Sequence, residues 1–105
     1  MKYDERILTL HPSGKTGVNI QRHKYEQVKK SIISKLKNRT MLSFDELTDL
    51  VEDDLKKSGF EGKPLWYIVT VKLDLEARKI IMRVPDVQSQ KGSHKIKLLK
   101  AKSIL

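Results

Sequence analysis

The tripeptide Gly14-Lys15-Thr16, within the stretch "HPSGKTGVNI", is how a phosphate-binding loop of nucleotide hydrolases ends. Such a loop needs a glycine five residues before Gly14, so that bare backbone amides can wrap the phosphates, and this chain has Thr9 there. The loop should also pass directly into a helix at its Lys-Thr pair, whereas Gly17 and an extended "VNI" follow here. The sequence therefore predicts a hairpin loop that binds no nucleotide.

The other side chains that could do chemistry form no recognisable catalytic or metal site. The histidines His11, His23 and His94 are isolated and lack metal-ligand spacing. The acids between positions 49 and 54 point to different sides of a helix, so they indicate a solvated acidic face rather than a metal cluster. No cysteine nucleophile or serine elbow is present. We expect no enzyme, no metal and no cofactor.

Charge is distributed unevenly along this chain of net charge +9. Positions 44–62 hold seven acids against two lysines, whereas the remainder holds twenty Lys or Arg against six acids. This separation predicts one acidic face and a larger basic face, and it favours a polyanion such as nucleic acid as the partner. A basic surface that only keeps the protein soluble is the alternative.

Length and hydropathy limit the size and the location of the protein. A chain of 105 residues buries one modest core. No apolar run reaches the length of a signal-peptide core or a membrane span, and the lack of cysteine fits a reducing compartment. We expect one compact cytoplasmic unit without a membrane partner.

The elements that must position any site begin with a hairpin and a helix. The β-prone pieces "ILTL" and "GVNI" predict an N-terminal β-hairpin extension over residues 1–20, ahead of a compact domain over residues 21–105. A first helix is predicted from Arg22 to Lys37, because apolar residues recur there at helical spacing: Tyr25, Val28, Ile32 and Leu36.

Two further helices have clear start signals. Ser43 as N-cap with Glu46 three residues later predicts a capping box, and Gly59 predicts the end of that helix. Pro64 predicts the first position of a third helix that continues to about Lys79. The run "YIVTV" alone would favour a strand, but the following "KLDLEARK" favours a helix.

Two strand-like pieces close the chain, "IIMRV" and "HKIKLL", and they predict a β-hairpin with a polar, basic tip. The order helix, short extended piece, helix, helix, hairpin is that of a winged helix-turn-helix. We therefore predict an α+β fold with three helices, a C-terminal β-hairpin wing and the N-terminal β-hairpin extension.

Two resemblances support this fold. The segment "LEARKIIMRV" resembles the passage from recognition helix to first wing strand in winged-helix regulators. The blocks "LTLHPSGKTGVNI" and "WYIVTVKLDLEAR" are similar to a small uncharacterised bacterial protein family that brings no established activity.

In a winged helix, the third helix enters the major groove of duplex DNA and the wing approaches the backbone. Steps of 100° place Lys63, Tyr67 and Thr70 on one stripe of the third helix, together with Asp74 and Arg78. The first three are our groove-facing candidates, whereas Asp74 would repel phosphate. Because these three candidates include no Arg, Asn or Gln, the side chains best suited to reading bases bidentately, strong sequence readout is not expected.

The wing is better suited to phosphates, since it offers Arg83, Lys91, Lys95 and Lys97. These residues complete the predicted DNA-binding set. They predict a small transcriptional regulator or a nucleoid-associated factor whose partner is double-stranded DNA.

The third helix also has an apolar sector in excess of what one core needs: Trp66, Val69, Leu73 and Ala77. The N-terminal hairpin or a second subunit must cover this surplus, and a second subunit would make the protein a homodimer. We expect the hairpin to cover the region around Trp66. A winged-helix module for protein contacts without DNA binding, using this apolar face or the acidic second helix, is the alternative function.

Overall fold

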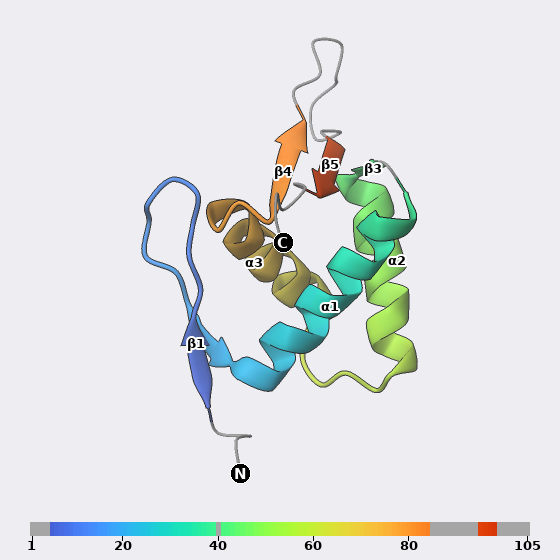
Figure 1. The fold of residues 1–105 in the computed structure, drawn as a ribbon. Coiled ribbons are helices and arrows are strands. Elements are labelled where there is room, and N and C mark those ends of the chain that lie inside the picture. Colours follow the sequence, from blue (N-terminus) through green and yellow to red (C-terminus); the bar gives the residue numbers. More distant parts are fainter. Residues whose placement is uncertain (1–4, 40, 85–94, 99–105) are drawn as a thin grey trace.

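A computed structural model describes residues 5–39, 41–84 and 95–98. Within them the chain is an α+β fold with three helices and two small antiparallel sheets (Figure 1). The predicted order of elements is confirmed. The elements are β1 (Arg6–Leu8), β2 (Asn19–Gln21), α1 (Arg22–Asn38), β3 (Leu42–Ser43), α2 (Phe44–Lys57), α3 (Pro64–Ala77), β4 (Ile81–Val84) and β5 (Lys95–Leu98).

Local hydrogen bonds fix both ends of α2 where the sequence predicts them. At its start, the Ser43 hydroxyl accepts the Glu46 N–H at 3.1 Å, and the Glu46 carboxylate accepts the Ser43 N–H at 3.0 Å. At its end, Gly59 has φ 75° and Phe60 donates its N–H to the Leu55 carbonyl at 3.0 Å. This is a Schellman end, for which glycine is the favoured residue.

The same ending closes α3, but without a glycine. Ile80 donates its N–H to the Leu75 carbonyl at 2.9 Å, and Lys79 donates its N–H to the Glu76 carbonyl at 3.1 Å. Lys79 takes the left-handed conformation, with φ 67°. The helix therefore ends at Ala77, slightly before the predicted boundary, because Lys79 occupies the turning position.

The second sheet has β5 as its central strand, in the order β3-β5-β4. Leu42 pairs with Ile96, and Ile81 pairs with Leu98. Leu42, Ile81 and Ile96 are buried, so one face of this sheet closes the core. Residues 85–94, which join β4 to β5, lie outside the described part.

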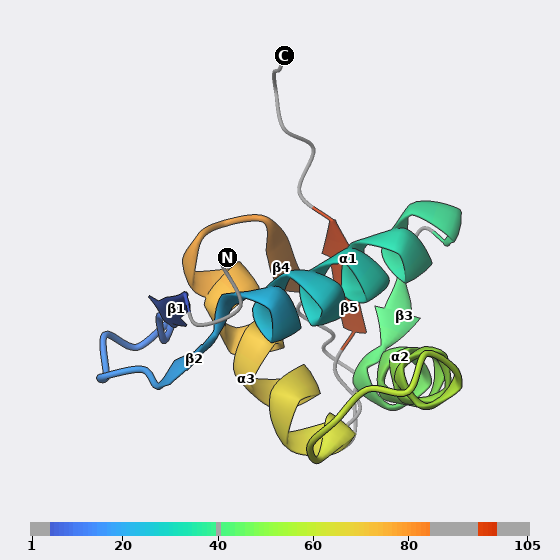
Figure 2. The ribbon, with the colours of Figure 1, turned by 90° about the horizontal axis from the view of Figure 1, so that it is seen from below.

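The core lies between this sheet face and the three helices, and the apolar stripe predicted for the first helix forms part of it. The N-terminal hairpin and α2 lie on opposite sides of the molecule, with α1 and α3 between them (Figures 1 and 2). No helix in the described ranges is long and apolar enough to cross a membrane. Helix residues buried in the core are Tyr25, Val28, Ile32, Leu36, Leu47, Val51, Leu55, Ile68, Val71 and Leu75.

The left-handed Lys79 predicts a stabilising substitution. Lys79→Gly removes the steric cost of that conformation, and we expect it to raise the free energy of unfolding by about 0.5–1 kcal/mol. Thermal denaturation measures this as a higher Tm. Lys79→Ala is the control, because it removes the charge but keeps the Cβ. A stabilisation as large in Lys79→Ala would contradict the backbone explanation.

Candidate nucleic-acid interface

The N-terminal hairpin closes tightly above its loop. Thr9 is only 2 % exposed. Its N–H donates to the Val18 carbonyl at 2.8 Å, and its hydroxyl accepts the Val18 N–H at 2.9 Å. A Cβ at Gly17 would lie 1.8 Å from the Thr9 carbonyl oxygen, so this close approach requires glycine.

The Gly14-Lys15-Thr16 tripeptide lies in the loop of this hairpin. Gly14 has φ 83° and donates its N–H to the His11 carbonyl at 2.9 Å, which closes a turn. The next helix begins only at Arg22. The predicted hairpin loop is confirmed, and the helix that a phosphate-binding loop needs does not follow the tripeptide.

A buried carboxylate ties this hairpin to two helices. The Asp74 side chain in α3 is 0 % exposed. Its Oδ1 accepts the Leu10 N–H at 2.8 Å, and its Oδ2 accepts the Tyr25 hydroxyl and the Arg78 Nε–H, the latter at 2.8 Å. The hydrogen bond to Asp74 raises the pKa of Arg78. Asp74 therefore joins the hairpin, α1 and α3, and it does not face a phosphate.

Within the polar stripe predicted for the third helix, Asp74 is thus buried and does not face solvent. Because Tyr25 and the hairpin supply donors to Asp74, this side of α3 turns inward and an apolar side faces outward. Along this stripe Lys63 and Arg78 are exposed, Tyr67 and Thr70 are half-buried, and Asp74 is buried.

Tyr67, predicted to face the groove, is a packing residue. Its ring meets the ring of Phe60 edge-on at a centroid distance of 5.1 Å, and that of Trp66 at 4.9 Å. The Lys24 ammonium lies 5.4 Å from the centroid of the Tyr67 ring. Of the three groove candidates, only Lys63 is fully exposed, and it precedes α3 at the end far from the sheet.

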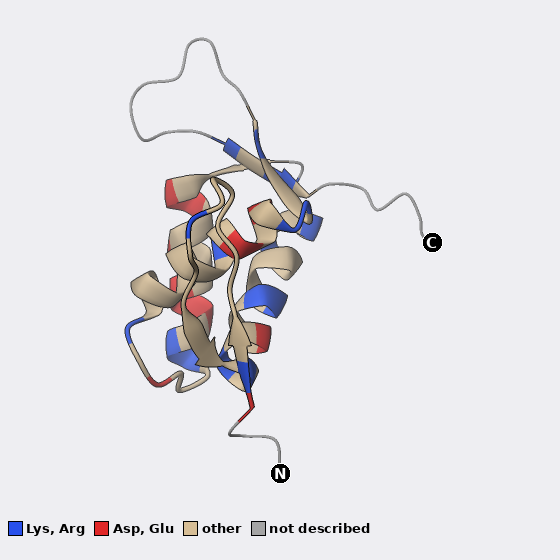
Figure 3. Ribbon diagram, turned by 90° about the vertical axis from the view of Figure 1, so that its left-hand side faces the viewer, with Lys and Arg blue, Asp and Glu red and all other residues tan. Residues whose placement is uncertain are grey.

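The sheet brings two of the predicted cations together. Lys95 and Lys97 flank the buried Ile96 on β5, so they share the sheet face that points away from the core. Arg83 is exposed, but it pairs with Ile96 on the neighbouring strand. It therefore lies on the same face of the sheet as Ile96, opposite the face of Lys95 and Lys97. Figure 3 shows the basic segments on both strands. The remaining wing candidate, Lys91, lies outside the described residues.

Arg39 is a basic residue that the sequence analysis did not assign to the site. The pKa of Glu46 lies below its usual value, chiefly because the Ser43 N–H hydrogen-bonds to the carboxylate, and the charges of Lys95 and Arg39 add to this. Both cations therefore lie near one carboxylate, at the start of α2. We name Arg39, Lys95 and Lys97 the basic surface. In the sequence, Arg39 lies in the segment "NRT", which follows the end of the predicted first helix and gives no other signal.

The basic surface has the Glu46 carboxylate beside it but makes none of the close ion pairs in the described part. Lysines on α2 are paired along their own helix, with Lys57 3.1 Å from Asp53 and Lys56 4.0 Å from Glu52. Among the described residues, none of the ion pairs involves a member of the basic surface. Cations without a close ion pair are suited to a polyanion.

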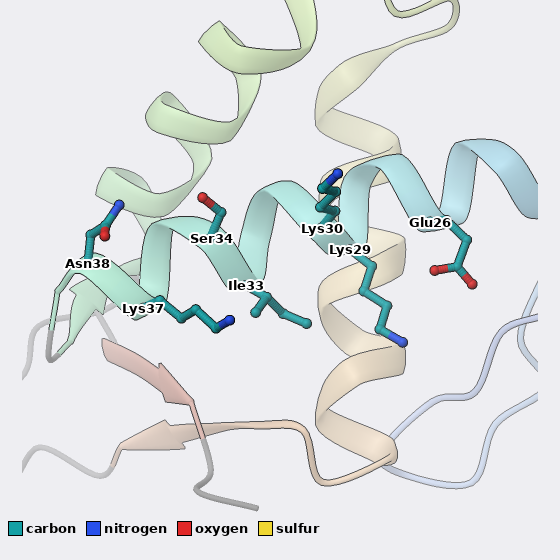
Figure 4. A pocket seen from close by; sticks show the side chains of 7 residues that line it. All are labelled: Glu26, Lys29, Lys30, Ile33, Ser34, Lys37 and Asn38. Atoms are coloured by element: carbon teal, nitrogen blue, oxygen red, sulfur yellow. The ribbon is translucent and has the colours of Figure 1, made fainter.

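A shallow hollow of about 500 Å³ lies along the outer side of α1 (Figure 4). Lys30 and Ser34 point to one side of the helix, whereas Lys29, Ile33 and Lys37 point to the other. All of the lining residues belong to α1, so the hollow is the space between long side chains and not a small-molecule site. No three His, Cys, Asp or Glu side chains in the described part could hold a metal ion.

Comparison with known proteins gives one match. The model of a family of unknown function, DUF6958, matches residues 6–91. No curated protein and no solved structure matches the chain.

The Tyr25 hydroxyl gives a prediction with a defined pH dependence. Burial and the hydrogen bond to Asp74 raise the pKa of Tyr25 above its ordinary value of 10.0. Near neutral pH, Tyr25→Phe removes one of three donors to a buried carboxylate, and we expect a loss of about 1–3 kcal/mol in the free energy of unfolding.

Above about pH 10, an unfolded tyrosine ionises while folded Tyr25 keeps its proton, so the wild type loses stability by up to about 1.4 kcal/mol per pH unit from this group. The difference between wild type and Tyr25→Phe should therefore shrink as the pH rises, as measured by urea denaturation. Tyr67→Phe is the control, since its hydroxyl makes none of the hydrogen bonds found in the described part. A difference that stays constant across this range would contradict the explanation.

Proposed function

Because that family model covers most of its length, the chain belongs to this family of unknown function, and we propose that it is a winged helix-turn-helix module that binds duplex DNA through the phosphates. Nucleic-acid binding by this chain would be mainly electrostatic, with little direct reading of bases.

The arrangement of the elements supports the winged-helix part of the proposal. The helices α2 and α3 follow one another as a helix-turn-helix pair, and β4 and β5 follow α3 as the antiparallel hairpin that would form the wing. The short strand β3, between α1 and α2, adds to this hairpin as the third strand of the sheet. This is the order of elements expected of a winged helix-turn-helix.

The observation that carries the DNA part is the basic surface. Lys95 and Lys97 lie on the outer face of the hairpin, and Arg39 and Lys95 both lie near the start of α2. Phosphate oxygens would supply close partners for these cations, which make none of the ion pairs in the described part. Phosphate contacts hold a duplex in position without reading its sequence.

The outward side of α3 argues for this mode over insertion of α3 into the major groove. Leu65 and Trp66 are exposed on it, and it lacks the Arg, Asn or Gln side chains that read base edges. A protein that contacts mainly phosphates suits a nucleoid-associated or accessory role. We expect similar affinity for duplexes of different sequence.

The salt dependence of DNA binding tests the proposal. If about four cations neutralise phosphates, the logarithm of the affinity should fall with the logarithm of salt concentration at a slope of about −3 to −4. The double variant Lys95→Ala/Lys97→Ala should make this slope shallower by about 2 and weaken binding roughly 10- to 100-fold at about 0.1 M salt. Fluorescence anisotropy of a labelled duplex measures both quantities.

The matched control is Lys56→Ala/Lys57→Ala on α2, which removes the same amount of charge from the acidic side of the molecule. This control should leave the slope nearly unchanged. Equal losses in the two double variants would show that only net charge matters and would contradict a defined basic surface. No measurable affinity of the wild type for duplex DNA would overturn the proposed function.

A further inference from the structure

The outward side of α3 forms an apolar strip that no described element covers. Leu65 is 51 % exposed and Trp66 is 47 % exposed, and Val69 and Leu73 are half-buried on the same side of the helix. We name Leu65, Trp66, Val69 and Leu73 the outer strip. An exposed run of large apolar side chains on one helix indicates a contact site.

The N-terminal hairpin does not cover the start of this strip, contrary to the expectation from the sequence. Its loop packs instead against the C-terminal part of α3, where the Leu10 N–H binds Asp74. There His11, Pro12 and Leu73 line a hollow of about 470 Å³ between the loop, α3 and β4. The hairpin therefore extends the strip into a groove at one end and leaves Trp66 exposed at the other.

Aromatic side chains form a small cluster at Trp66. Trp66 meets Tyr67 edge-on at 4.9 Å, and Tyr67 packs in turn against Phe60. Gly62, with φ 119°, lets the chain pass this cluster, because a Cβ there would lie 2.8 Å from the Tyr67 ring. Large aromatic side chains such as Trp66 are typical anchor residues of protein interfaces.

The charges at the two ends of the strip indicate what it binds. Lys63 is exposed immediately before α3, and Lys79 and Arg83 are exposed at the far end, where they line the hollow beside Leu73. Two copies of the chain that paired through this strip would bring cations to cations in either orientation. A partner with acids at both ends of an apolar stretch would instead complement all of these charges.

We propose that the outer strip is a docking site for an amphipathic helix of another protein, with large apolar side chains along one face and acidic residues at both ends. The strip from Leu65 to Leu73 is roughly 12 Å long, which two to three turns of a bound helix would cover. The site is separate from the basic surface and does not depend on DNA binding.

A model peptide tests the proposal with the full chain. The probe is a synthetic helical peptide without tryptophan that has leucines at i, i+3, i+4 and i+7 and glutamates at both ends. Trp66 is the single tryptophan of the chain, so its fluorescence reports directly on the strip. We expect a saturable blue shift of its emission, and protection of Trp66 from quenching by acrylamide, when the peptide binds.

Two matched variants locate the binding. Leu65→Gln should weaken peptide binding at least about 10-fold, as measured with a labelled peptide, because it removes an anchor from the strip. Leu8→Gln should leave binding unchanged, since Leu8 is 55 % exposed on β1 and is not part of the outer strip. Lys95→Ala/Lys97→Ala should also leave it unchanged, which separates this proposal from the proposed DNA binding.

Four results would overturn the proposal. The first is equal binding of a peptide with lysines at its ends. The second is a Trp66 that is already shielded in the free chain, since residues of the same chain would then cover it. The third is a blue shift that grows with protein concentration together with a dimer mass in light scattering. The fourth is stronger shielding of Trp66 by duplex DNA than by the peptide.

Discussion

The buried carboxylate of Asp74 determines how α3 is placed in this fold. A charge without access to water costs several kcal/mol unless donors satisfy it, and here the Leu10 N–H, the Tyr25 hydroxyl and the Arg78 guanidinium do so. Two of these donors come from other elements, so α3 can satisfy its acid only by turning that side toward α1 and the hairpin. The rotation of α3 about its own axis is thereby fixed.

A second polar pair lies inward on the same helix. Lys72 is buried and its ammonium lies 3.0 Å from the Glu76 Oε2, an ion pair whose geometry lacks an aligned hydrogen bond. The same ammonium lies 5.1 Å from the centroid of the Phe44 ring on α2. Polar side chains of α3 thus point inward on two sides, and its surplus apolar residues are left to face outward. These outward-facing apolar side chains form the outer strip.

The consequence is a molecule with two distinct surfaces. Cations of β5 and the residue Arg39 form the basic surface on the sheet and beside the start of α2. The apolar strip follows α3, with Leu65 and Trp66 exposed at its N-terminal end. In the functions that we propose, the first surface binds phosphates and the second binds a helix of another protein, so one small domain could join the two partners.

The sequence by itself determined the local structure: the capping box at Ser43, the Schellman glycine at Gly59, the start of α3 at Pro64 and the apolar stripes of the core. These features depend on neighbours within a few residues, so their pattern can be read along the chain. Only the tertiary structure decided which side of α3 faces solvent, because Asp74 finds its donors 49 and 64 positions away. A rule that places polar residues outside fails wherever distant donors make burial of a polar group favourable, and this is why the polar stripe predicted on α3 is interrupted by the buried Asp74 while Lys63 and Arg78 stay exposed.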